Sequence, residues 1–201
     1  MPISADITRH HEPVPGDNPW IGGAPKPEPI ELVAYDASWP AAFAGIAGVL
    51  RASLGDAAIA IDHIGSTSVP GLAAKPVIDV DLTVSDPADE AAYVPFLENS
   101  GFILVIREPG WHEHRCLQLS DPRSNIHVFG PDCPEIVRHR MFRDWLIAHP
   151  DDCELYHRAK LAAAKETTAR GGLMTDYNRH KEPVLHAIYE RMFRAHGLLD
   201  R

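Results

Sequence analysis

An acidic pair inside an apolar run constrains the fold of this chain most. Residues 76–84 read Pro-Val-Ile-Asp-Val-Asp-Leu-Thr-Val, so Asp79 and Asp81 alternate with aliphatic side chains. A period of two predicts a β-strand that turns both carboxylates to one face of a sheet and the aliphatic side chains to the other. Burying carboxylates is costly unless cations or hydrogen-bond donors compensate. The pair therefore faces solvent, pairs with arginines or binds a metal ion.

The segment before this strand contains a turn suited to phosphate binding. Residues 58–64 predict a strand, and residues 65–75 predict a loop that begins with Gly65, Ser66 and Thr67. Glycine lets the backbone approach a phosphate closely, and nearby amides and hydroxyls donate hydrogen bonds to it. The P-loop pattern is absent, and a Gly-Ser pair alone is common in ordinary turns. Placed before the acidic strand, it favours a phosphate-bearing ligand.

The rest of the chain predicts an α+β (α/β) fold with a helical C-terminal part. Periods of two and of 3.6 residues, punctuated by Gly and Pro, define the expected elements. We expect further strands at 30–34, 102–107, 114–119 and 126–129, and helices at 39–54, 86–99, 135–148, 152–170 and 176–196.

The charge balance and the cysteines narrow the class of partner and the compartment. There are 19 basic and 28 acidic side chains, a net charge of −9, and no basic stripe of the kind that grips nucleic acid. Three isolated cysteines without a C-x-x-C pair predict reduced thiols. The sequence shows neither an apolar run long enough to span a membrane nor a signal-peptide pattern. We expect a cytoplasmic protein without nucleic-acid or membrane partners.

Residues 1–29 differ in composition from the rest of the chain. They contain seven prolines and three glycines, a composition that disfavours helices and strand ladders and buries little apolar surface. We expect an irregular arm that is dispensable for folding, with Trp20 and Ile21 docking on the body, and a folded domain over residues 30–201.

The block H-I-G-S-T-S-V-P-G-L-A-A-K-P-V-I-D, residues 63–79, closely resembles the GrpB family. The likeness extends upstream to Tyr35-Asp36 and Trp39-Pro40 and downstream to residues 125–128, 142–146, 149–150, Tyr156, Lys160, Tyr177 and Lys181. The fold of that family is similar to the nucleotidyltransferase superfamily. The resemblance implies a mixed β-sheet flanked by helices.

This resemblance also implies a chemistry. Gly65 and Ser66 would position a nucleoside triphosphate, ATP being the expected one, and Asp79 and Asp81 would bind Mg²⁺ as the catalytic pair. An acceptor would then attack the α-phosphorus in line. Active members of the superfamily commonly have a third acid on a later strand, where this chain offers His127, with Glu113 nearby. The GrpB family tends to show histidine where this chain has Asn125.

Basic side chains complete the expected triphosphate site. Lys75 precedes the acidic strand, Arg115 and Arg123 flank the later strands, and Lys160 and Lys181 lie on the predicted C-terminal helices. Lys181 shares a helix face with Tyr177 because the two are four residues apart. Each cation is otherwise a solvated surface group. His63 is expected to orient the phosphate turn or to satisfy a buried polar neighbour.

Three functions remain open at this point. The first is a magnesium-dependent nucleotidyltransferase that uses a small-molecule acceptor. The second is a nucleotide- or metabolite-binding protein on the same fold without catalysis. The third is a metal-dependent hydrolase with a histidine-based zinc site around His112, His114, His63 and His127, although no H-E-x-x-H motif is present. Fold analogy alone does not choose among them.

Overall fold

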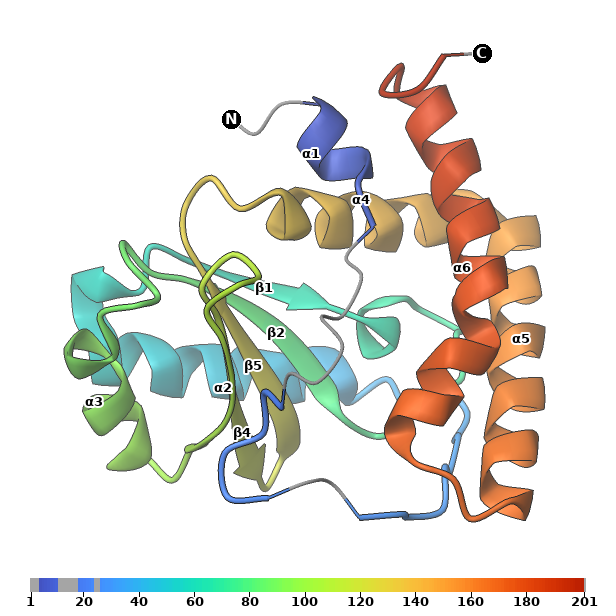
Figure 1. The fold of residues 1–201 in the computed structure, drawn as a ribbon. Helices are drawn as coiled ribbons and strands as arrows, with labels where there is room; N and C mark the ends of the chain where they lie inside the picture. Colours follow the sequence, from blue (N-terminus) through green and yellow to red (C-terminus); the bar gives the residue numbers. More distant parts are fainter. Residues whose placement is uncertain (1–3, 11–17, 24–25, 201) are drawn as a thin grey trace.

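A five-stranded sheet organises the structure, a computed structural model that describes residues 4–10, 18–23 and 26–200 (Figure 1). The strands are β1 (Ala60–Ile64), β2 (Ile78–Thr83), β3 (Ile103–Glu108), β4 (His114–Ser120) and β5 (Arg123–Phe129), in the spatial order β1-β2-β5-β4-β3. Only β2 and β5 run parallel, and the other neighbours are antiparallel. The mixed sheet confirms the expected fold class.

One face of the sheet is apolar and carries the main core. The helix α2 (Trp39–Leu54) and the short helix α3 (Val94–Glu98) cover it, and a 3-10 turn precedes α3 at Glu90–Ala92. Val80, Leu82, Ile126 and Val128 are fully buried against this layer. Because side chains alternate along a strand, burying these residues turns Asp79, Asp81 and their cross-strand neighbours to the opposite face.

Three helices follow the sheet and form the C-terminal part. They are α4 (Pro134–Ala148), α5 (Pro150–Ala169) and α6 (Met174–Ala195), and α5 and α6 lie side by side in Figure 1. A second core holds them together, with Trp145, Tyr156, Ile188, Met192 and Phe193 buried in it. This part confirms the helical C-terminus expected from the sequence.

The N-terminal segment is more ordered than its composition predicts. Ser4–Thr8 form a helical turn, α1, whose Ile7 side chain is only 7% exposed. Arg138 of α4 donates hydrogen bonds to the carbonyl groups of Asp6, Ile7 and Arg9. The expectation of an irregular arm is therefore wrong for this turn, because a buried guanidinium satisfies carbonyls at its C-terminal end.

The docking of the segment around Trp20 is confirmed. Trp20 forms a bridge to Ile106 on the edge strand β3, and the Ile21 amide donates to the Val105 carbonyl over 2.9 Å. Residues 1–3, 11–17 and 24–25 of the arm, and Arg201, lie outside the described residues.

Two expected elements are shorter in the structure. Residues 30–34 form only an isolated bridge between Val33 and Ala74 instead of a strand. The helix expected over 86–99 is confined to α3, because Pro95 fits only the first turn of a helix and so fixes its start at Val94.

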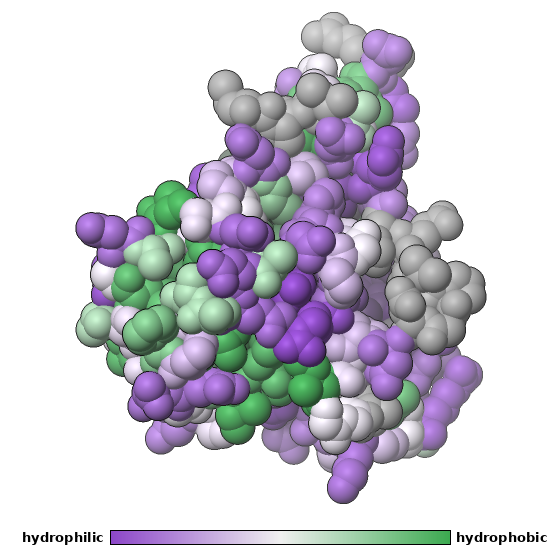
Figure 2. Space-filling model, turned by 60° about the vertical axis from the view of Figure 1, so that its left-hand side comes forward, coloured by the Kyte–Doolittle hydropathy of each residue, from purple (hydrophilic) through white to green (hydrophobic). Residues whose placement is uncertain are grey.

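The surface of the molecule exposes some large apolar side chains. On the face that Figure 2 brings forward, hydrophobic residues gather beside a strongly hydrophilic area. Phe96 on α3 and Ile103 on β3 are more than half exposed, at 51% and 59%. Within the described ranges, no helix combines the length and apolarity needed to cross a membrane.

Candidate functional site

The polar face of the sheet brings the acidic strand against polar residues of β5. Asp79 and Asp81, called the acid pair below, stand beside Asn125 and His127 in the parallel register of the two strands. On the other side of β2, Asp62 of β1 stands opposite Asp81 and binds Arg140 of α4. Charged and amide groups therefore occupy the middle of this face, while Phe129 at its end packs against Ile136 of α4.

Asp79 is locked against the turn that precedes its strand. Its Oδ1 accepts a hydrogen bond of 2.8 Å from the Asn125 amide, and the side chain is half-buried. A Cβ placed on Gly65 would stand only 2.5 Å from Asp79 Oδ2, and Gly65 has a φ of +69°. Glycine at this position thus satisfies both a left-handed backbone and the close approach of a carboxylate.

Asp81 has a cationic partner that the sequence did not reveal. Its side chain is 0% exposed, and Nδ1 of His139 on α4 lies 2.9 Å from its Oδ2. Burial opposes the charge on His139 most strongly, but the charge of Asp81, its hydrogen bond and the charge of Glu135 together raise the pKa of His139. This ion pair offsets the cost of burying Asp81.

The turn after β1 is exposed to solvent at its first residues and buried at Thr67. Gly65 is exposed and Ser66 half-buried, whereas Thr67 is 1% exposed. The Thr67 hydroxyl lies 3.0 Å from Nε2 of His63 and 3.4 Å from the Val77 carbonyl. Burial lowers the pKa of His63 to about 4. His63 and Thr67 therefore hold the turn together, and Gly65 and Ser66 are the positions open to a ligand.

Three lysines from different segments meet beside the acid pair. Lys75 of the loop before β2, Lys160 of α5 and Lys181 of α6 form this lysine cluster around the rings of Tyr156 and Tyr177. The charge of Asp79 acts on both Lys75 and Lys160, which places the cluster next to the acid pair. Of the expected cations, Lys75, Lys160 and Lys181 are brought together, with Tyr177, whereas Arg123 pairs with Glu28.

Arg115 and Glu113 lie elsewhere. Arg115 lies on the same face of β4 as Leu117, which is the apolar face of the sheet. Its side chain is 5% exposed there and forms an ion pair with Glu90 over 2.5 Å. Glu113 sits in the turn before β4 with a φ of +52°, and its carboxylate lies 3.6 Å from Arg115. The structure therefore does not bring these two residues to the acid pair.

His127 joins the polar face through a chain of hydrogen bonds. Its Nδ1 lies 3.1 Å from Nε2 of His114, whose Nδ1 lies 2.7 Å from Glu108. Burial and the neighbouring His114 lower the pKa of His127. His63 stacks on Phe43 of α2 instead of meeting these histidines. Among the described residues, no group of three or more His, Cys, Asp or Glu side chains suits a metal ion.

The acid pair fits magnesium by its chemistry. Mg²⁺ prefers oxygen ligands and is commonly held by one or two carboxylates while phosphates and water fill its shell, so a larger protein cage is not required. Asp79 fits this role directly, because Asn125 is the one side chain in the described part of the chain that donates to it. Asp81 would share its charge between the ion and His139. Asp79 is therefore the residue of this face that would hold such an ion.

Sequence reasoning missed His139 and Glu108, and it noted Asn125 only as a departure. His139 lies 58 residues from Asp81 in the chain, in a helix whose sequence gives no sign of which strand it will meet. Lys160 was visible only as one of several basic residues on the C-terminal helices. Its 2% exposure, which sets it apart, depends on tertiary packing.

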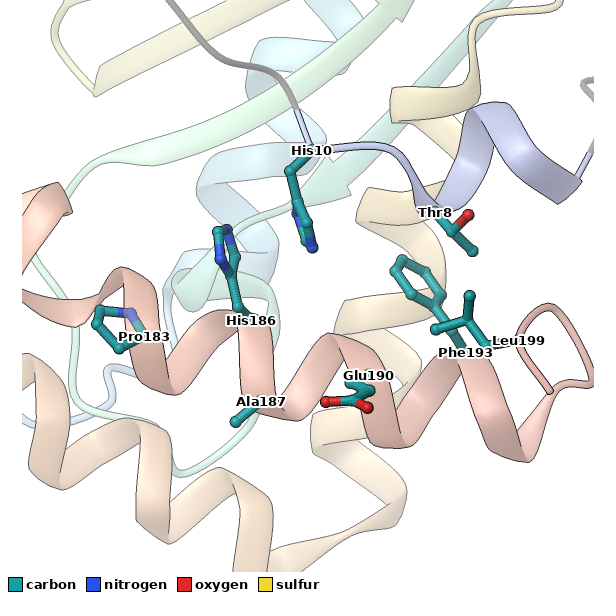
Figure 3. Close-up of a pocket in the computed structure, with 8 residues that line it drawn as sticks. All are labelled: Thr8, His10, Pro183, His186, Ala187, Glu190, Phe193 and Leu199. Atoms are coloured by element: carbon teal, nitrogen blue, oxygen red, sulfur yellow. The ribbon is translucent and has the colours of Figure 1, made fainter. Parts of the chain in front are cut away.

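Two cavities lie apart from the acid pair and the lysine cluster. One, of about 460 Å³, is bounded by α6 and the N-terminal segment, where His10 stacks on His186 (Figure 3). The other, of about 400 Å³, lies along α4 near Trp145 and His149. Neither is lined by a residue of the acid pair or of the lysine cluster.

The fold and the polar face together define an α+β domain with a mixed sheet, one face of which carries a group of charged and polar side chains. The chain belongs to the GrpB family, because the model of this family, described as GrpB protein, matches residues 29–191. The crystal structure of conserved protein GrpB from Enterococcus faecalis superimposes with a TM-score of 0.71 at 26% identity, over 83% of this chain and 99% of that one.

Sequence relatives agree with this assignment. A UPF0157 protein of Halalkalibacterium halodurans is 48% identical over 68% of this chain and 70% of its own length. One of Streptomyces coelicolor is 36% identical over 85% and 88%. The dephospho-CoA kinase of Mycolicibacterium paratuberculosis is 31% identical over 81% of this chain, which spans only 46% of that protein.

Proposed function

We propose that this protein is a magnesium-dependent enzyme of the nucleotidyltransferase type, which acts on a nucleoside triphosphate, ATP foremost, and on a small-molecule acceptor. The observation that carries the proposal is the close contact between the Gly65 turn and the Asp79 carboxylate. Asp79 is held against Gly65 so closely that a Cβ there would stand 2.5 Å from its Oδ2. An open glycine turn and an oxygen ligand are thus presented as one unit.

The charges around this unit support a polyphosphate ligand. Gly65 and Ser66 offer backbone and hydroxyl donors, and the lysine cluster supplies positive charge on the side of α5 and α6. Arg115 takes no part in this proposal, because it binds Glu90 on the other face.

The proposed chemistry needs little more than positioning and charge. The acceptor forms a bond to the α-phosphorus, the bond from that phosphorus to the β-phosphate breaks, and pyrophosphate leaves. A bound magnesium ion would neutralise phosphate charge and orient the reacting groups. Asp79 would hold the ion, Gly65 and Ser66 would orient the triphosphate, and His139 would keep Asp81 ionised beneath it.

A binding protein on the same fold is the second candidate. It is favoured by the ion pair between Asp81 and His139, which gives one carboxylate of the pair a structural partner. It is also favoured by the lack of a third acid at the His127 position of β5. The relative named dephospho-CoA kinase supports a nucleotide-related role in either case, although its named activity is not carried over from a match to under half of its length.

The test combines binding with product release. Nucleoside triphosphates are screened by thermal shift with magnesium or with chelator, and pyrophosphate release is then measured. We expect Asp79→Asn to abolish magnesium-dependent ATP binding while the protein stays folded, and Asp56→Asn, which changes an exposed carboxylate, to leave it intact. Stabilisation with release supports the enzyme, and stabilisation alone supports the binding protein. ATP affinity unchanged in Asp79→Asn would contradict both.

A further inference from the structure

The lysine cluster gathers positive charge from three segments that are far apart in the sequence. Lys181 lies over the ring of Tyr177, 4.7 Å from its centroid, and 5.8 Å from the centroid of Tyr156. Lys160 lies 5.5 Å from the Tyr156 centroid, and Lys75 lies 5.8 Å from that of Tyr177. Both tyrosines are almost fully buried, so two fixed rings hold the three ammonium groups together.

No carboxylate of the described residues is in ion-pair contact with the cluster, and Asp79 acts on it only from a longer distance. The ion pairs along α5 and α6 engage arginines and histidines, and no ion pair among residues 4–10, 18–23 and 26–200 includes any of the three lysines. Within the described ranges, the hydrogen-bond partner of Lys75 is the Met174 sulfur atom at 3.0 Å, and that of Lys181 is the Tyr156 hydroxyl at 3.5 Å. Like charges gathered without a carboxylate in direct contact disfavour one another unless an anion joins them.

Lys160 is the most unusual member of the cluster. It is only 2% exposed, and its ammonium group donates to the Ala73 carbonyl over 2.7 Å. An ammonium group has three donors, so one bond to a carbonyl leaves hydrogen-bonding capacity for a ligand. Lysine is almost never buried to this degree without a charged partner.

We propose that Lys75, Lys160 and Lys181 form an anion site for a pyrophosphate-class group, and that this site binds its anion without a metal ion. This inference rests on the proposed function in one respect only, namely that the bound phosphate groups belong to a nucleoside triphosphate. In that setting the cluster would hold the β- and γ-phosphates, beside the α-phosphate that faces Gly65 and Asp79. Tyr156 and Tyr177 shape the site and do not supply charge.

The surroundings of Lys160 couple anion binding to the uptake of a proton. Burial and the ammonium groups of Lys181 and Lys75 lower the pKa of Lys160 to about 7, against the attraction of Asp79 and of the Cys153 thiol. A bound anion favours the charged form of the lysine. At about pH 8, anion binding should therefore be accompanied by proton uptake at this residue.

Calorimetric titration with inorganic pyrophosphate in the presence of chelator tests the site. We expect the wild-type protein to bind, and Lys160→Met and Lys181→Met each to weaken binding by roughly 10- to 100-fold, as expected for losing a hydrogen bond to a charged group. Lys165→Met is the matched control, since it removes an exposed lysine from the same helix as Lys160. Lys181 is only half-buried, so its variant keeps the test valid if Lys160→Met fails to fold.

Repeating the titrations in buffers with different ionisation heats measures the protons taken up. The wild-type protein should take up more protons than Lys160→Met with the same ligand. The proposal is overturned if wild-type protein does not bind pyrophosphate without metal, or if both cluster variants bind as tightly as Lys165→Met. Pyrophosphate binding without magnesium-dependent ATP binding would keep this site and reject the proposed function.

Discussion

At the scale of single residues, Gly65 is where the backbone and the chemistry of the site meet. Gly65→Ala would combine a left-handed φ of +69° with a Cβ only 2.5 Å from a carboxylate oxygen. Backbone strain costs about 1–2 kcal/mol, and forcing the carboxylate aside adds roughly 1–3 kcal/mol. We expect both a loss of stability in urea unfolding and weaker ATP binding.

Gly71 provides the matched control for this prediction. Its φ is +81°, but a Cβ there would meet nothing within 4 Å. Gly71→Ala should therefore show the strain of about 1–2 kcal/mol alone and leave ligand binding unchanged. Equal losses of stability in the two variants would mean that the contact between Gly65 and Asp79 has no energetic consequence.

The two carboxylates of the acid pair should respond differently to neutralisation. On sequence alone, both Asp79→Asn and Asp81→Asn are expected to leave stability unchanged or slightly raised, because like charges on one strand face repel. The structure keeps this expectation for Asp79. Asp81→Asn should instead destabilise the protein by roughly 3–5 kcal/mol, the cost of breaking a buried pair, because it leaves His139 without its partner.

The loss in Asp81→Asn should depend on pH. The pKa of His139 is raised in the folded protein, so its stabilising effect is complete below the ordinary histidine value of about 6.5 and is lost as pH rises through the raised pKa. The difference between wild type and Asp81→Asn should be largest between about pH 5 and 6.5 and shrink at alkaline pH. A difference that grows with pH in urea unfolding would contradict the ion pair.

At the scale of secondary-structure elements, most strands and helices could be predicted because their signals are local. The alternation in β2 and the periodicity of α2 depend only on neighbouring residues. What could not be predicted depends on contacts across the fold. Ile7 has no apolar periodicity around it, and it is buried because its side chain joins the core of the C-terminal helices while Arg138, 131 residues away, binds its carbonyl group. The pairing of His139 with Asp81 has the same character.

Removing the N-terminal segment tests the most consequential of these contacts. The sequence predicts that deleting residues 1–25 costs on the order of 1 kcal/mol. In the structure the deletion exposes the site of Ile7 and leaves the buried Arg138 guanidinium with Glu135 as its ion-pair partner. We therefore expect a larger loss, of roughly 2–5 kcal/mol, from apolar exposure and unsatisfied donors together.

A double-mutant cycle isolates the role of Arg138 in this loss. Arg138→Met should destabilise the full chain, in which it removes hydrogen bonds to Asp6, Ile7 and Arg9. It should cost less in the chain that lacks residues 1–25, where those bonds are already gone. Additive effects in thermal unfolding would show that α1 and Arg138 do not cooperate.

At the scale of the whole molecule, the site lies where two separately built cores meet. The apolar face of the sheet packs on α2 and α3, while α4, α5 and α6 pack around their own buried side chains. The polar face, the acid pair and the lysine cluster lie between these units. A ligand held by both the β2 loop and the C-terminal helices would therefore bind only the folded protein and raise its melting temperature.

The overall charge sets a limit on the kind of ligand. The protein has a net charge of −9, and its clustered lysines are few and partly or wholly buried. A polynucleotide gains affinity from many exposed cations that replace its counterions, whereas three clustered lysines suit a single small polyphosphate. In mobility-shift assays with duplex DNA and transfer RNA at about 150 mM salt, we expect no complex tighter than about 10 μM. A specific nanomolar complex would contradict this limit. It would direct attention to nucleotidyltransferases that modify RNA, with the 3′ end of the RNA as the acceptor in place of a small molecule.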